Sequence, residues 1–137
     1  MNNKVYTGIR VPQPPGMKKR LLIADDDEGL RDIFRMIFEK EDYEVDIFEN
    51  AGELMKMNFK FPDLFLIDRL LSGVDGLDLC RFLKNNWNTR HIPVIMISAT
   101  PDIALQSRLA GADAFVEKPF QMAYLLKVVK EQLAKKR

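Results

Sequence analysis

Three consecutive aspartates and a glutamate directly follow a short apolar run in the segment LLIADDDE, residues 21–28. Like charges at contact distance repel, and each carboxylate makes its neighbours harder to ionise. Two interpretations are open at this point. The acids cap the start of a helix, as single acids in such positions usually do, or they surround a cation. Asp68, Ser98 and Lys118 each end a later apolar run.

Taken together, these residue types favour phosphoryl transfer to a carboxylate. Oxygen ligands from two or three carboxylates suit Mg²⁺, which also neutralises charge on a transferred phosphoryl group. A lysine and a serine hydroxyl are donors to phosphate oxygens. A carboxylate nucleophile would form an aspartyl phosphate. The segment LIADDDE is therefore predicted to be a metal site.

Five apolar runs alternate with five segments of helical periodicity. The predicted strands are 20–24, 43–48, 63–68, 92–98 and 114–118, and the predicted helices are 30–40, 51–58, 76–87, 101–111 and 121–136. This order predicts an α/β fold, a doubly wound five-stranded parallel sheet with five helices. In such folds ligands bind outside the carboxyl ends of the strands. Each residue singled out above has an ordinary structural role when taken alone, but all of them lie on that edge.

Composition limits the remaining possibilities. The chain has 137 residues and a net charge of +1, so we expect one domain and no direct binding to nucleic acid or membrane. A single cysteine, Cys80, and the lack of a long apolar run favour a cytoplasmic location. Residues 1–17 hold three prolines and are predicted to be an N-terminal extension of a domain at 18–137. The two KKR tripeptides, 18–20 and 135–137, are expected to be solvated.

Several motifs resemble those of the receiver domain of bacterial two-component response regulators, which has a flavodoxin-like fold. They are DD at 25–26, LIDRLLSGVDG at 66–76, ISA at 97–99, GADAF at 111–115 and KPF at 118–120. The resemblance covers residues 18 to 137. It implies a switch protein that a sensor histidine kinase or a histidine phosphotransfer protein phosphorylates.

The resemblance also implies a role for individual residues. Asp68 would be the phosphoacceptor, and Asp25, Asp26, Asp68 and the backbone carbonyl of Leu70 would hold Mg²⁺. Ser98 and Lys118 would contact the phosphoryl group, and the Lys118–Pro119 peptide bond would be cis. Phe115 falls at the family's switch aromatic, although a packed strand residue is an equal interpretation.

The signal would pass to a downstream effector protein or to a C-terminal output domain, and a phosphorylation-dependent homodimer is a further expectation. The chain departs from the family pattern at Ser72, where proline is usual, in a shortened segment between 98 and 111, and in its N-terminal extension. By resemblance, Leu70 and Thr100 flank the path of the water that hydrolyses the phosphoryl group. Neither has an acid or amide side chain.

Two alternatives remain open from the sequence. Asp25-x-Asp27 after an apolar strand resembles the acid pair of haloacid-dehalogenase-type phosphatases, which also use Mg²⁺. That interpretation leaves Asp68 without a role, and the chain has no room for a cap domain. The second alternative is a pseudo-receiver that binds partners without being phosphorylated.

Overall fold

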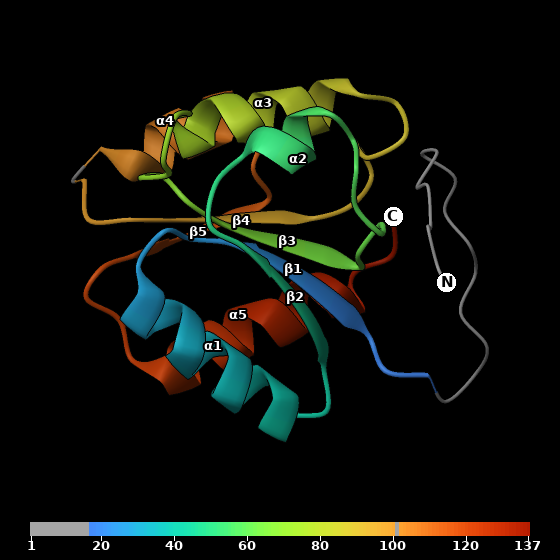
Figure 1. Ribbon diagram of the computed structural model, residues 1–137, viewed down its shortest axis with the longest axis vertical. Helices are drawn as coiled ribbons and strands as arrows, with labels where there is room; N and C mark the ends of the chain where they lie inside the picture. The colour runs from blue at the N-terminus through green and yellow to red at the C-terminus, as the bar shows by residue number, and fades with distance from the viewer. Residues whose placement is uncertain (1–16, 101) are drawn as a thin grey trace.

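The computed structural model describes residues 17–100 and 102–137. Strands and helices alternate along this part of the chain (Figure 1). The strands are β1 (Arg20–Ala24), β2 (Glu44–Phe48), β3 (Leu64–Asp68), β4 (Val94–Ser98) and β5 (Ala114–Glu117). The helices are α1 (Glu28–Lys40), α2 (Gly52–Met55), α3 (Gly76–Asn85), α4 (Ile103–Leu109) and α5 (Met122–Ala134).

The five strands form one parallel sheet in the order β2-β1-β3-β4-β5. Helices α1 and α5 cover one face, and α2, α3 and α4 cover the other (Figure 1). The predicted doubly wound sheet is therefore confirmed. The winding reverses between β1 and β3, so the carboxyl ends of these two strands lie at the place where such sheets bind ligands.

Successive side chains along each strand point to opposite faces of the sheet, so the protein has one hydrophobic core on each face. On β3, for example, Phe65 and Ile67 pack toward α2, α3 and α4, while Leu64 and Leu66 pack toward α1 and α5. All five residues of β3 and all five of β4 are buried. This burial on both faces explains why these strands have continuous apolar runs in place of alternation.

Several element boundaries differ from those expected. Helix α1 begins at Glu28, two residues earlier than predicted, because Asp27 caps it. Helix α2 is one turn long and not the predicted 51–58, since Met57 adopts a left-handed φ of 58° soon after it. Helix α4 covers only Ile103–Leu109, a shorter element than the predicted 101–111.

Residues 1–16 and Pro101 lie outside the described residues. The division into an extension and a domain at 18–137 thus remains a prediction. Within the described residues, none of the helices combines the length and the apolarity that a membrane span needs.

Candidate functional site

Asp25 directly follows β1 and points into the protein. Its side chain is buried, and its Oδ1 accepts a hydrogen bond of 2.9 Å from the Asp27 N–H. Its Oδ2 is buried with no hydrogen-bond partner among the described residues. Burial, reinforced by the negative charge of Asp68, raises the pKa of Asp25 to about 7, although the Asp27 N–H opposes this shift. An unpartnered carboxylate oxygen of this kind calls for a cation or a proton.

Asp68 is the last residue of β3 and is only 3% exposed. The Leu70 N–H donates to its Oδ1 at 2.8 Å, and the Lys118 ammonium donates to its Oδ2. Lys118 comes from the end of β5, where its own N–H donates to the Ser98 carbonyl at 2.9 Å. The Lys118–Pro119 peptide bond is cis. A buried, oriented carboxylate therefore faces a single ammonium group.

Asp26 and Asp27 have different surroundings from those of Asp25. Asp26 is exposed, and its Oδ2 accepts a long hydrogen bond of 3.5 Å from the Ser72 hydroxyl. Asp27 is the N-cap of α1, where its side chain accepts from the Leu30 N–H at 3.0 Å. Of the two interpretations of this acidic run, capping therefore applies to Asp27. Asp25 and Asp26 are free for another role.

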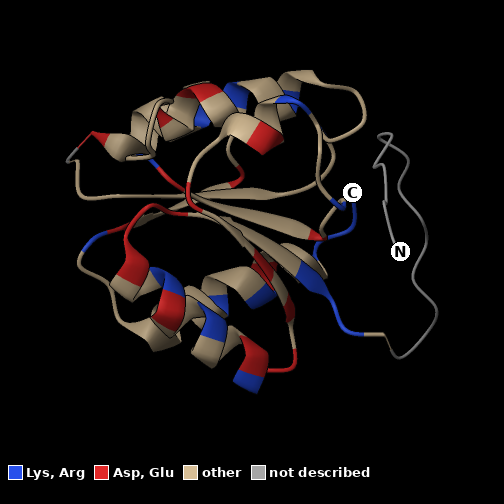
Figure 2. Cartoon of the chain, in the orientation of Figure 1, with Lys and Arg blue, Asp and Glu red and all other residues tan. Residues whose placement is uncertain are grey.

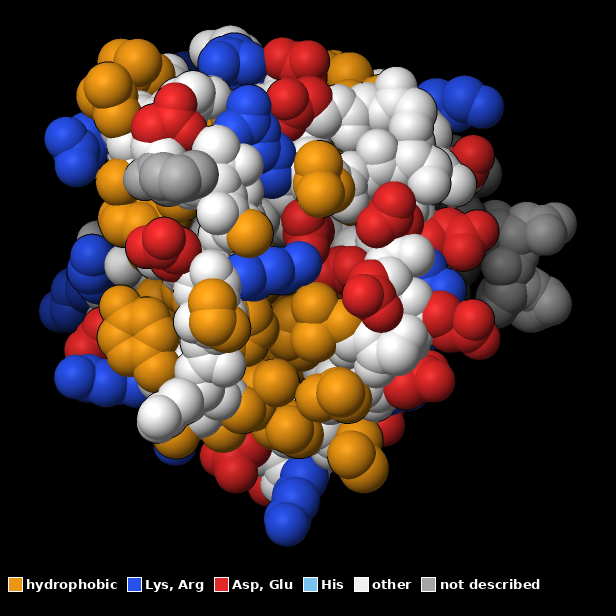
Figure 3. Space-filling view, turned by 90° about the vertical axis from the view of Figure 1, so that its left-hand side faces the viewer, with side chains coloured by type: hydrophobic (Ala, Val, Ile, Leu, Met, Phe, Trp, Pro, Cys, Tyr) orange, Lys and Arg blue, Asp and Glu red, His pale blue; other side chains and the backbone are white. Residues whose placement is uncertain are grey.

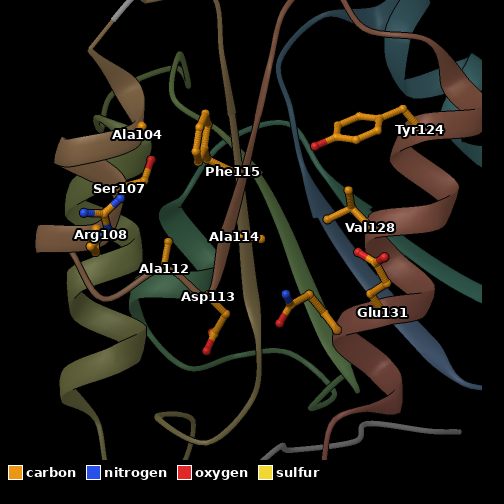
Figure 4. A pocket seen from close by; sticks show the side chains of 11 residues that line it. Ala104, Ser107, Arg108, Ala112, Asp113, Ala114, Phe115, Tyr124, Val128 and Glu131 are labelled. Carbon is orange, nitrogen blue, oxygen red and sulfur yellow. The ribbon is translucent and has the colours of Figure 1, made fainter.

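Ser98 ends β4, next to Asp68 in the sheet. It is buried, and its hydroxyl oxygen accepts from the Thr100 N–H at 3.0 Å. Phe115, on β5, is 37% exposed, and its ring lies on the side of the strand that faces α4 (Figure 4). The structure thus gives Phe115 a place at the surface beside α4, and its role as a switch stays a prediction.

Two neighbours of the site have no signal in the sequence alone. A Cβ atom built on Gly76 would lie 2.2 Å from the backbone carbonyl oxygen of Asp68, so only glycine lets α3 start this close to β3. The Arg31 guanidinium donates to the Asp25 carbonyl at 3.2 Å and pairs with Glu49 at 3.4 Å. Both contacts depend on tertiary packing, which local patterns do not encode.

The acidic residues at this edge fit a Mg²⁺ ion that keeps part of its water shell. Figure 3 looks onto the edge where the strands end and shows acidic side chains gathered beside a basic one. Among residues 17–100 and 102–137, no three carboxylate, imidazole or thiol groups are arranged to hold a metal by themselves. Mg²⁺, however, keeps several waters and commonly uses only one or two carboxylates. The unpartnered Oδ2 of Asp25 and the exposed carboxylate of Asp26 match that requirement.

Comparison with known proteins agrees with this geometry. The model of the response regulator receiver domain matches residues 21–130. The phosphate regulon transcriptional regulatory protein PhoB of Rhizobium meliloti is 33% identical over 120 residues, which cover 85% of this chain and 53% of PhoB. The chain spans about half the length of curated relatives that it matches.

Solved structures show the same fold. A CheY-like receiver domain protein from Methanospirillum hungatei is 36% identical, with a TM-score of 0.75 over 85% of this chain and 94% of that one. The receiver domain of the sensor histidine kinase PA1611 from Pseudomonas aeruginosa, which has a magnesium ion in its active site cleft, is 19% identical. Its TM-score is 0.78 over 86% of this chain and 99% of that one.

These matches favour neither the phosphatase alternative nor the pseudo-receiver alternative. Asp68 is paired with Lys118, and a phosphatase built on Asp25 would leave Asp68 without a function. The relatives, the solved structures and the family model all agree, and the chain belongs to the response regulator receiver domain family of two-component signalling.

Proposed function

We propose that Asp68 accepts a phosphoryl group from the phosphohistidine of a sensor histidine kinase or of a histidine phosphotransfer protein. The observation that carries this proposal is the buried Asp68 carboxylate, paired with Lys118 beside the unpartnered oxygen of Asp25. The aspartyl phosphate then changes the contacts that this domain makes with a partner. The domain is a switch that assists its own phosphorylation and dephosphorylation.

In the transfer, an oxygen of Asp68 attacks phosphorus and the bond from phosphorus to the histidine nitrogen breaks. The acyl phosphate forms, and the imidazole leaves with a proton. The Leu70 N–H and the Lys118 ammonium both donate to the Asp68 carboxylate and orient it. The same ammonium can then pair with an oxygen of the bound phosphoryl group.

Mg²⁺ would be held by Asp25, Asp26, Asp68 and the Leu70 carbonyl, and when bound it would neutralise charge on the phosphoryl group. The buried hydroxyl of Ser98 accepts from the Thr100 N–H, which leaves its own proton free to be donated to a phosphoryl oxygen. A shift of Ser98 toward that oxygen would be followed by Phe115. The change would then reach the exposed surface between α4 and α5.

The signal would go to a separate effector protein or to a C-terminal output domain, and a phosphorylation-dependent homodimer is part of the same proposal. Relatives such as PhoB are named as transcriptional regulators. Binding of nucleic acid by this chain itself is not part of the proposal. The reaction is placed in the cytoplasm, in line with the single, buried Cys80.

Labelling with acetyl phosphate and Mg²⁺, followed by peptide mapping, tests this function. Wild type should carry an acyl phosphate on Asp68, and Asp68→Asn should carry none while unfolding at a similar temperature. Asp75→Asn is the matched control, since Asp75 is a nearby helix cap and Asn caps equally well. Equal labelling of wild type and Asp68→Asn would refute the assignment, and label on Asp25 would point to a phosphatase.

A further inference from the structure

Two basic segments from opposite ends of the sequence meet at the edge of the sheet where the strands begin. Lys19 precedes β1, Lys135 and Arg137 follow α5, and all three line one pocket. Figure 2 shows the two blue stretches converging at that end of the molecule. Asp63 lines the same pocket and directly precedes β3, whose last residue is Asp68, so about 17 Å of extended chain lies between the two aspartates. The pocket is therefore distinct from the phosphorylation site.

The pocket is concave and carries an excess of positive charge. Its volume is 280 Å³. Among the described residues of the lining, Lys19, Lys135 and Arg137 contribute three positive charges and Asp63 contributes one negative charge. Asp63 is largely buried, and its Oδ2 accepts a 2.8 Å hydrogen bond from the Arg20 N–H. The charged side chains of this lining therefore leave an excess of two positive charges.

The cations themselves remain available. Among the described residues, Lys19 and Lys135 form no ion pair, nor do the exposed neighbours Lys136 and Arg90. The Arg137 guanidinium is held in place by two 2.7 Å hydrogen bonds to the backbone and side-chain oxygens of Gln132. Arg137 also donates to the Lys135 carbonyl at 3.2 Å and pairs with Asp113 at 3.9 Å, so only part of its five N–H donors is left for a ligand. The pocket thus combines one oriented, partly engaged guanidinium with two exposed ammonium groups.

We propose that this pocket binds a small polyanion, a ligand with two or more phosphate or carboxylate groups. Two negative charges would balance the net charge of the described side chains in the lining. Ile92, Pro93 and Leu133 supply an apolar wall for the carbon portion of such a ligand. A volume near the lower end of the range for ligand pockets favours a small molecule. An extended nucleic acid is disfavoured because the part of the lining that the structure describes holds no Phe, Tyr or Trp side chain.

The proposal is independent of the chemistry at Asp68. It uses side chains at the opposite edge of the sheet and none of the residues in the phosphorylation site. A chain that cannot be phosphorylated should therefore bind the anion with unchanged affinity. The anion-binding proposal can therefore fail while the proposed phosphorylation of Asp68 stands, and the reverse is also true.

Titration calorimetry of the full chain in low salt, without Mg²⁺, tests the proposal with pyrophosphate, ATP and citrate. Saturable binding of at least one is expected, and preference for pyrophosphate or for citrate identifies phosphate or carboxylate as the recognised group. Changing Lys19→Gln together with Lys135→Gln should weaken binding by at least about tenfold, as expected for the loss of charged hydrogen bonds. Asp68→Asn should bind like wild type.

The matched control is Lys60→Gln with Lys127→Gln, which removes the same charge from exposed positions outside the pocket. It should leave affinity unchanged. Equal weakening in both double variants would show a mere effect of net charge and would overturn the proposal. Failure of all three anions to saturate would also overturn it. The proposal would likewise be overturned if vesicles of anionic lipid or duplex DNA bound at the pocket and none of the three small anions did.

Discussion

At the scale of single residues, Asp25 gives a prediction about pH. Its folded-state pKa of about 7 lies above the ordinary value of 3.8, so the folded chain holds more protons between these limits. The titration of Asp25 therefore lowers the free energy of unfolding as pH rises from about 4 to about 7. Below and above this range, Asp25 does not change the free energy of unfolding with pH. In EDTA, urea unfolding at about pH 5 and about pH 8 should show a larger loss of stability for wild type than for Asp25→Asn. Identical losses in the two proteins would contradict the raised pKa.

A second residue-scale prediction concerns the lifetime of the phosphoryl group. Leu70 is 73% exposed and apolar, and Thr100 carries a hydroxyl, so neither residue has the acid or amide side chain that would orient water for attack. We expect the phosphoryl group on Asp68 to last minutes or longer in the purified protein. Leu70→Asn should shorten that lifetime by about tenfold, because an amide can position water. Decay within seconds in wild type, measured by loss of label, would refute this expectation.

At the scale of elements, the contact between β3 and α3 depends on Gly76. Replacing Gly76 with Ala places a Cβ atom 2.2 Å from the Asp68 carbonyl oxygen and forces α3 away from the site. We expect destabilisation of about 1–3 kcal/mol, together with slower phosphorylation. Gly29→Ala is the matched control within α1, where the nearest atom lies 3.4 Å away. That change should stabilise the protein by about 0.5–1 kcal/mol in urea unfolding. Equal effects of the two substitutions would exclude the proposed close approach.

Elements with a strong local pattern are those that the sequence predicts well. Strands β1, β3 and β4 are continuous apolar runs because both of their faces are buried, and strand ends place Asp68, Ser98 and Lys118 on one edge. Helix α2 is shorter than its pattern because Met57 adopts a left-handed conformation that no local signal announces. The unpartnered oxygen of Asp25 and the contact of Arg31 with the Asp25 carbonyl arise only from packing between distant segments.

Over the whole molecule, a net charge of +1 conceals a polarised distribution. The edge where strands end carries the acids of the phosphorylation site, whereas the edge where strands begin carries the basic pocket. By the two proposals above, the edges would take ligands of opposite sign, a cation at one and a polyanion at the other. Since the sheet holds them apart, the two sites can be occupied together.

Metal binding should stabilise the whole fold, because the proposed Mg²⁺ site exists in the folded chain and not in the unfolded one. At a concentration one hundred times its Kd, Mg²⁺ should add about 2.7 kcal/mol to the free energy of unfolding of wild type. Asp26→Asn should change the metal-free stability by no more than about 0.5 kcal/mol, since Asp26 is exposed.

The same substitution should reduce the stabilisation by magnesium, because it removes one of the anionic oxygens proposed as ligands. Thermal melts of both proteins in EDTA and in Mg²⁺ provide the measurement, and Asp75→Asn, outside the proposed ligand set, is the control. Asp75→Asn should keep the full magnesium shift, as Asn preserves the cap of α3. If Asp26→Asn also kept the full shift, Asp26 would be no ligand, and the acidic run after β1 would need only the capping role of Asp27.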